Sequence, residues 1–291
     1  MIKCLNKIIE KIYNLKHIQN TIFGGLGFIG SNLCQSLKKD SLPFQIISRQ
    51  DSLPTGNLGN VFYCAGITAD FRSRPFDTID AHVSTLASVL ENCQFFSFTY
   101  LSSARMYRKN SLTTEETKFT IDPLEPEDLA DVSKLTGEAL CLSMKDKRVR
   151  VVRPSNVFGN DFLSKNFLTE IIEAALITRK IVLRSALDSS KDYVDVDSVV
   201  NIMRRISERG THRIYNIASG YNISHQSIVQ LLRDLTGCKL SLVDDATSII
   251  WPAINIDRIQ LEFCFKSLNL MDELETLVRH FKSHLLKENR I

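Results

Sequence analysis

Short apolar runs alternate with helix-like stretches along the first half of the chain. Residues 21–23 are a strand-like run that leads into a glycine-rich turn, and the residues after the turn place Ile29, Leu33 and Leu37 on one helical face. Residues 44–47 form a second strand-like run. A strand, an amphipathic helix and a second strand in this order predict one parallel βαβ unit.

The alternation continues up to Pro154. We expect strands at residues 61–64, 96–101 and 149–152, and helices at residues 81–90 and 129–142. This order predicts an α/β fold: a Rossmann-type doubly wound parallel sheet with helices on both faces.

Beyond Pro154 the pattern is more mixed. We expect a first domain over residues 19–160 and a smaller mixed α/β lobe over residues 161–291, with some of its segments returning to the first sheet. In this second half the pattern predicts helices at residues 167–177, 196–207, 227–235 and 270–281 and short strands at residues 181–183 and 214–217.

The N-terminal residues 1–18 precede the first strand. Ile2, Leu5, Ile9 and Ile12 recur there at helical spacing opposite lysines, which predicts a short amphipathic helix. A basic amphipathic helix can dock on a membrane surface. Packing on its own domain or on a second subunit is commoner, and we favour it.

Composition narrows the class of protein. The 36 basic and 33 acidic residues are interspersed and leave a net charge of +3, so no nucleic-acid footprint emerges. Seven cysteines, spread singly, suit neither a disulfide framework nor a metal site. No apolar run reaches the roughly 20 residues of a membrane span. We expect a cytoplasmic protein with no metal and no integral membrane segment.

The glycine-rich turn has the context of a dinucleotide site. Gly24 allows the tight turn, Gly27 lets the backbone approach a pyrophosphate, and Gly30 allows close packing of helix on strand. The amides that open the helix, at Phe28 and Ile29, can donate to the anion. We therefore expect residues 19–160 to bind NAD or NADP, and residues 161–291 to bind mainly the substrate.

The end of the second predicted strand bears on the choice of cofactor. An acidic residue there would hold the ribose hydroxyls of NAD, but this chain has Ser48 and Arg49. A guanidinium offers forked donors to the extra 2′-phosphate of NADP. The alternative is a solvated arginine on a loop. We expect NADP rather than NAD.

Several segments, in order, are similar to one known family. The chain resembles the extended short-chain dehydrogenase/reductase family, the sugar-nucleotide epimerases, dehydratases and ketoreductases, over nearly its whole length. The matching segments are IFGGLGFIGSN (22–32), VFYCAG (61–66), YLSSARMY (100–107), Ser133-Lys134 with Glu138, RPSNVFG (153–159), KDYVDVD (191–197) and IYNIAS (214–219).

The resemblance implies roles for individual residues. Ser103 would bind the sugar hydroxyl or carbonyl, and Lys134 would hydrogen-bond the nicotinamide ribose. The remaining residues of the implied sites are Cys64, Ala65 and Gly66, which would line the cofactor, and Asn156, Lys191 and Arg184, which would meet the substrate. For Arg184 a solvated role is equally open. His82, where the family often has Asn, we expect to be a polar core contact, and we expect Asp195 and Asp197 to cap and start a helix.

One position departs from the family pattern. The family's acid/base tyrosine lies four residues before the lysine, and Ala130 stands there. Either Ala130 is an engineered replacement, or the protein uses another acid such as Asp131, Tyr107 or a water, or it binds the cofactor without catalysis. We expect Tyr107 to have a packing role.

A second departure lies between residues 49 and 61. The eleven residues 50–60 cannot supply the helix and strand that the family usually places there. The sheet should therefore lose its outer third strand and leave the second as an edge.

The resemblance implies an NAD(P)-dependent nucleotide-sugar oxidoreductase of surface-polysaccharide sugar biosynthesis. We expect a 4-keto-sugar reductase, with epimerase or dehydratase as near variants, acting as a homodimer. The alternative is a non-catalytic NAD(P)-binding sensor or scaffold. The sequence does not name the sugar or the nucleotide.

Overall fold

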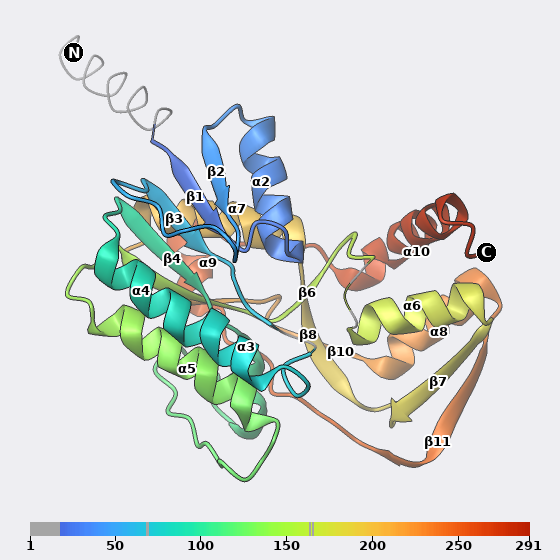
Figure 1. Cartoon of the computed structure of the whole chain (residues 1–291). Coiled ribbons are helices and arrows are strands. Elements are labelled where there is room, and N and C mark those ends of the chain that lie inside the picture. The colour runs from blue at the N-terminus through green and yellow to red at the C-terminus, as the bar shows by residue number, and fades with distance from the viewer. Residues whose placement is uncertain (1–17, 68–69, 163, 165) are drawn as a thin grey trace. The chain divides into compact units, whose positions relative to one another are not determined.

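A computed structural model describes residues 18–67, 70–162, 164 and 166–291 (Figure 1). The helix expected over residues 1–18 lies outside the described residues, except for residue 18. The chain divides into two compact units with interleaved segments. Unit 1 holds Met1–Ser102, Pro123–Val152 and Val200–Ile214, and unit 2 holds Ser103–Asp122, Arg153–Val199 and Tyr215–Ile291.

Unit 1 is built on a parallel sheet, as the sequence predicts. Its strands run side by side in the order β2-β1-β3-β4-β5, and neighbouring strands are parallel throughout. The strands are β1 (Asn20–Phe23), β2 (Phe44–Ile47), β3 (Asn60–Tyr63), β4 (Ser97–Leu101) and β5 (Val149–Pro154, whose last two residues belong to unit 2). Apart from β2 they are buried along their whole length, as is typical of parallel strands that helices cover on both faces.

Helices cover both faces of this sheet (Figure 1). One face carries α2 (Phe28–Lys39), and the other carries α4 (Thr85–Asn92) and α5 (Asp128–Ser143). Arg204, on the part of α7 (Val196–Arg209) that belongs to unit 1, donates to Ser36 of α2 and to Asp40, the residue that follows α2. This doubly wound arrangement confirms the predicted fold class.

The predicted loss of a strand is also confirmed. Within the described part of unit 1, β2 is an edge strand, and residues 48–59 hold only an isolated bridge between Asn57 and Gln94. Gly59 closes this short connection with φ of 66°, and a Cβ there would lie 1.9 Å from the carbonyl oxygen of Gln19. The chain therefore passes directly from β2 to β3 across a position that only glycine can occupy.

The helix expected at residues 81–90 is longer and less regular than predicted. It consists of α3 (Pro75–Ile79), the π-helical turn η1 (Asp80–Ser84) and α4 in direct succession. His82 lies in η1 and is buried. A π-helical turn inside a helix is rare and is often found at functional sites.

Unit 2 contains more strands than the sequence predicts. β6 (Asn156–Phe158), β8 (Ser190–Asp195) and β10 (Asn222–Ser224) form a three-stranded sheet in the order β10-β8-β6. β7 (Lys180–Ser185) pairs in parallel with β11 (Lys239–Thr247). The expected strand at 214–217 is present as β9 (Ile214–Ile217). Most of the missed strands are short or have several polar positions.

Three helices build the core of unit 2. α6 (Phe167–Ile177), α8 (His225–Thr236) and α10 (Leu270–Lys287) pack on one another beside β7 and β11 (Figure 1). Two short helices, η2 (Ala104–Lys109) and α9 (Asp257–Phe263), complete the unit. The buried side chains that the three helices share include Ile171, Ile172, Ile228, Leu232, Leu274 and Phe281.

Helix α5 lies unusually close to the unit 1 sheet. A Cβ on Gly137 would lie 2.3 Å from the Tyr100 hydroxyl and 2.8 Å from the carbonyl oxygen of His82. At its C-terminal end, Arg213 donates to the carbonyls of Cys141 and Met144, which otherwise have no helical partner. Gly137 and Arg213 together fix the position of α5.

Replacing Gly137 should therefore destabilise unit 1. We expect Gly137→Ala to lower the free energy of unfolding by about 3 kcal/mol, because the added methyl group meets both a buried ring and backbone. Denaturant unfolding measures the change. Thr136→Ala, at the exposed neighbouring position, is the control and should stay within about 0.5 kcal/mol of the original protein. Equal stability of the two variants would contradict the close packing.

Candidate cofactor and substrate sites

The glycine-rich turn is closed by its own backbone. Gly24 has φ of 75°, and a Cβ on it would lie 2.6 Å from the backbone nitrogen of Ala65. A Cβ on Gly30 would lie 2.2 Å from the carbonyl oxygen of Gly24. The amide of Gly27 donates to the same carbonyl at 3.1 Å. Two of the three glycines are therefore required by close backbone contacts.

Gly27 leaves the entrance of α2 open. A Cβ there would meet only the carbonyl oxygen of Gly24, at 3.4 Å, and no side chain caps the helix. The first amides of α2, from Phe28 and Ile29, are thus of the kind that accept an anion at a helix N-terminus. These residues fit the pyrophosphate of a dinucleotide, because backbone donors converge where side chains are absent.

The end of β2 lies beside this turn. The Ile46 side chain would be 2.9 Å from a Cβ on Gly25. Two residues beyond β2, Arg49 donates to Asp77 at 2.6 Å and lies 3.5 Å from Asp80. The amide of Ser48 donates to Asp51 at 2.7 Å. The structure therefore places the end of β2 next to the glycine turn, and Arg49, two residues beyond that end, is already paired.

Lys134 is a buried ammonium group beneath the carboxyl end of the sheet. Its Nζ donates to the carbonyl oxygen of Leu101 at 2.8 Å and lies 5.1 Å from the centre of the Tyr100 ring. Burial lowers the pKa of Lys134 to about 8, because the charged form loses its hydration. Lys134 is held in place by the end of β4, rather than solvated on the helix surface.

Residues 64–66 connect Lys134 with the glycine turn. Cys64 continues β3, since its amide donates to the carbonyl of Phe23 at 2.9 Å. Gly66 is exposed, and a Cβ there would lie 3.2 Å from Nζ of Lys134 and 2.9 Å from Nε2 of His82. The structure thus brings together the glycine turn, residues 64–66 and Lys134, all within unit 1.

His82 belongs to a closed hydrogen-bond chain. The amide of Ile67 donates to Nε2 at 3.2 Å, which assigns the ring proton to Nδ1. Nδ1 then donates to Oγ of Ser133 at 2.8 Å, and Ser133 donates to the carbonyl of Ala130 at 3.0 Å. Burial, and secondarily Lys134, lowers the pKa of His82 to about 2. His82 is a neutral polar contact in the core, as expected.

The groups considered as substitutes for the missing tyrosine have different surroundings. Ala130 has only a methyl side chain one helical turn before Lys134. The Tyr107 hydroxyl is fully buried in unit 2, within 2.9 Å of acceptors on Thr114 and Asn216, and it accepts from Arg153 at 2.6 Å. These contacts give Tyr107 the packing role expected of it. Asp131 is buried, with 5% of its surface exposed.

Ser103 belongs to unit 2. It caps η2, because its Oγ accepts from the amide of Arg105 at 3.1 Å. The hydroxyl proton is not used in this contact and can still be donated. Ser103 is half-buried, so the residue is partly accessible to solvent.

Lys191, on β8, lies between two aromatic rings. Its Nζ is 5.7 Å from the centre of the Phe167 ring and 5.3 Å from that of Trp251. Burial lowers the pKa of Lys191, and the charge of Arg105 adds to this effect. The carboxylate next to it in sequence, Asp192, is turned away into bonds with Ser155, Ser219 and Gly220. Lys191 is a half-enclosed cation bordered by rings.

The other two predicted substrate residues differ in environment. Asn156 donates to the carbonyl of Asp192 at 2.8 Å and joins β6 to β8. Arg184 lies on the exposed side of β7. As expected, Asp195 caps α7, because it accepts from the amide of Ser198 at 2.7 Å.

Two aromatic residues next to Lys191 were not singled out from the sequence. Trp251 follows β11 in an irregular segment, and Phe167 is the first residue of α6. Neither residue lies in one of the segments that match the family. One signal could have drawn attention to the first of them, because Trp251 is the only tryptophan of the chain.

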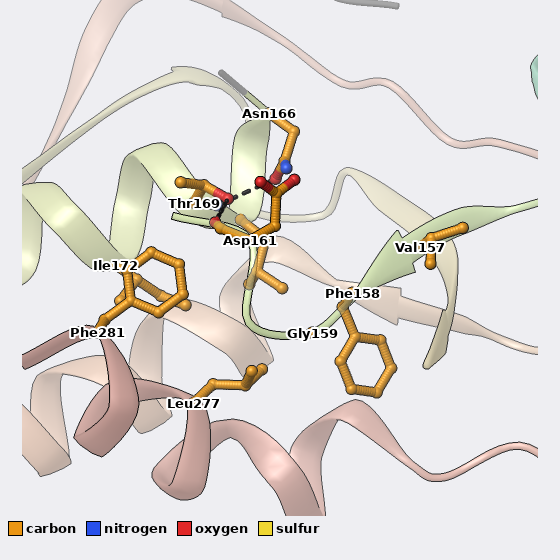
Figure 2. A pocket seen from close by; sticks show the side chains of 10 residues that line it. Val157, Phe158, Gly159, Asp161, Asn166, Thr169, Ile172, Leu277 and Phe281 are labelled. Atoms are coloured by element: carbon orange, nitrogen blue, oxygen red, sulfur yellow. Dashed lines mark hydrogen bonds between the residues drawn. The ribbon is translucent and has the colours of Figure 1, made fainter. Parts of the chain in front are cut away.

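Unit 2 also has a small pocket, shown in Figure 2. Asp161, Asn166 and Thr169 border its polar side, where the amide of Thr169 donates to Asn166 at 3.0 Å. None of the predicted site residues borders it. The remaining lining residues are Val157, Phe158, Gly159, Leu168, Ile172, Leu277 and Phe281.

The residues that the structure describes bear on two further expectations, the absence of a metal-binding cluster and of a membrane-spanning helix. Those residues contain no cluster of three or more His, Cys, Asp or Glu side chains that could hold a metal ion. Among the same residues, no helix is long and apolar enough to cross a membrane.

Known proteins resemble this chain in sequence and in fold. A dTDP-glucose 4,6-dehydratase of Streptomyces griseus is 26% identical over 198 residues, which cover 65% of this chain and 59% of the dehydratase. The structure of MoeE5 in complex with UDP-glucose and NAD superposes with a TM-score of 0.76 at 19% identity, covering 92% of this chain and 99% of MoeE5.

A second solved structure has the same fold with another cofactor. RMD from Pseudomonas aeruginosa, complexed with NADPH, gives a TM-score of 0.71 at 19% identity and covers 92% of this chain and 98% of its own. The NAD dependent epimerase/dehydratase family matches residues 48–218, which is more than half of the chain. With its parallel sheet, glycine turn and buried Lys134, the chain belongs to the NAD dependent epimerase/dehydratase family.

Proposed function

We propose that the protein is an NAD(P)-dependent nucleotide-sugar oxidoreductase, specifically a 4-keto-sugar reductase. The observation that carries this proposal is the buried ammonium of Lys134 beneath exposed Gly66, beside a glycine turn open to an anion. Burying a charge costs free energy, so a buried ammonium is expected to have hydrogen-bond acceptors around it. A ribose hydroxyl at Gly66 would give that ammonium a second acceptor besides the Leu101 carbonyl.

In this proposal the two units divide the work. Unit 1 holds the dinucleotide: the α2 amides meet its pyrophosphate, and Cys64, Ala65 and Gly66 line the nucleotide. Arg49 favours NADP over NAD, because a guanidinium at the end of β2 can meet the 2′-phosphate. Unit 2 holds the nucleotide-linked sugar.

The charges and rings of unit 2 suit a nucleoside diphosphate. Lys191 would meet the diphosphate as a point charge, and Trp251 and Phe167 beside it offer faces on which a base can stack. Asn156 and Arg184 would supply further donors. The diphosphate would bind because its negative charge stabilises the Lys191 ammonium, which has lost part of its hydration on burial.

A bound nicotinamide supplies hydride transfer to or from a sugar carbon. Ser103 would polarise the substrate carbonyl through its unused hydroxyl proton, and Lys134 would orient the ribose. Ala130 has no proton to give, and the His82–Ser133 chain ends on a backbone carbonyl. The proton must therefore reach the substrate oxygen from another group or from water. We expect the reduction to be slower than with a tyrosine at position 130.

Restoring a tyrosine at position 130 tests the reaction. With NADPH and nucleotide-linked 4-keto-sugars, we expect slow oxidation of NADPH by the original protein and an increase of about 10²- to 10⁴-fold in Ala130→Tyr, because a general acid is returned. Absorbance at the reduced nicotinamide band measures it. Ala130→Phe, which fills the same space without a hydroxyl, is the control.

A non-catalytic role is the second candidate, and Ala130 is the observation that favours it. A sensor or scaffold would bind the cofactor and change its assembly or partners on binding. Cofactor binding without turnover in either the original protein or Ala130→Tyr would support this role and overturn the reductase.

The buried lysine makes cofactor binding depend on pH. Since the pKa of Lys134 is about 8, its positive charge is present below that pH and is lost above it. We expect NADPH affinity to fall as pH rises through about 8, and Lys134→Met to bind about tenfold more weakly at pH 7 without this dependence. Fluorescence titration measures both. Lys145→Met, at an exposed position after α5, should behave like the original protein.

We further propose a homodimer formed through α3 and α5, which pack on each other. These helices and the segment that precedes α5 carry exposed apolar side chains: Phe76 (88% exposed), Leu124 (89%), Ile79 and Val132. Exposed apolar surface of this kind is typical of an interface.

A charge within this surface should separate the subunits. We expect Phe76→Glu to halve the mass measured by light scattering after gel filtration, because the free energy needed to bury the carboxylate exceeds the free energy of association of the two subunits. Leu261→Glu, at an 85% exposed position on α9, is the control and should leave the mass unchanged. A monomeric original protein would refute the dimer.

A further inference from the structure

Arg49 is not a free cation. Its Nη2 donates to Oδ1 of Asp77 at 2.6 Å, and Asp80 lies 3.5 Å away. Arg74 donates to the other oxygen of Asp77, from Nε at 2.9 Å and from Nη2 at 2.8 Å. Two arginines thus clamp one carboxylate, and that carboxylate is the partner of Arg49.

This arrangement depends on the missing outer strand. Because residues 48–59 lead directly from β2 to β3, the first turn of α3 comes within reach of the end of β2. Asp77 lies in that turn. Its partner Arg49 lies two residues beyond the end of β2, the strand end at which a Rossmann-type site meets the adenosine ribose, so the Asp77 carboxylate is tied to that strand end.

We propose that Asp77 is a specificity-determining residue, which competes with the adenosine 2′-phosphate of NADP for the guanidinium of Arg49. The inference rests on the proposed function, because it requires a dinucleotide in unit 1. NAD has no 2′-phosphate and leaves the Arg49–Asp77 pair intact. NADP must share or displace Asp77, so the carboxylate weakens NADP binding alone.

The local charge supports a selective effect. Arg49 and Arg74 are balanced by Asp77 and Asp80, so the group as a whole offers no net positive charge to a phosphate dianion. The hydrogen bond with Arg49 is also the largest cause that lowers the pKa of Asp77. The carboxylate is thus charged at neutral pH, where it opposes the phosphate.

The expected effect is moderate. The side chains of Arg49 and Asp77 are 58% and 34% exposed, and exposed pairs contribute little in water. We expect Asp77→Asn to strengthen NADPH binding about two- to fivefold and to leave NADH binding unchanged. Arg49→Gln should weaken NADPH binding and also leave NADH binding unchanged.

The experiment measures dissociation constants of NADPH and NADH by fluorescence titration of the full chain at one fixed salt concentration. The variants are Asp77→Asn, Arg49→Gln and the double variant. Glu91→Gln is the matched control, because it removes the same charge from an exposed position of α4 and leaves Arg49 untouched. In the Arg49→Gln background, Asp77→Asn should lose its effect, since the two residues act as a unit.

Two kinds of affinity change would overturn the inference. One is an equal change of NADPH and NADH affinity in Asp77→Asn. The other is a gain for NADPH that persists without Arg49 or is matched by Glu91→Gln, which would show a general charge effect. If neither nucleotide binds the original protein, the proposed function itself fails, and the inference fails with it. Binding of both nucleotides with no effect of Asp77→Asn overturns the inference alone.

Discussion

The position of one helix against one strand constrains the rest of unit 1. Gly137 lets α5 approach Tyr100 so closely that no side chain fits between them, and this approach brings Lys134 to the carbonyl at the end of β4. The ammonium then lies under Gly66, where its charge adds to burial, the main cause, in lowering the pKa of His82. A helix held farther from the sheet would leave the lysine in water, with an ordinary pKa and no fixed direction.

The first half of the fold was predictable because its signals are local. A glycine turn between a strand-like run and an amphipathic helix needs no information from distant residues, and β1, β3 and β4 each combine β-branched or aromatic residues with burial from end to end. The missing strand followed from counting residues. In unit 2 the sequence is less informative: β8 has the sequence SKDYVD, and β11 is exposed at most positions, so neither shows an apolar run or a clean alternation.

The candidate site was predictable where a motif carries it and not where tertiary contact creates it. Lys134 and Gly66 could be assigned from the family resemblance, but their proximity could not. Arg49 and Asp77 are 28 positions apart and meet only because of the short connection between β2 and β3. Trp251 borders Lys191 from an irregular segment, and irregular segments have no periodicity from which to place a residue.

Losing an outer strand has a consequence for solubility as well as for nucleotide recognition. An edge strand exposes a row of amides and carbonyls to which another chain can add. β2 limits this risk because it is four residues long and is succeeded by a polar stretch that contains Arg49 and Asp51. Gln45 also turns its side chain amide onto Thr21 of the neighbouring strand. The shortened sheet thus ends in an edge too brief to template a foreign strand.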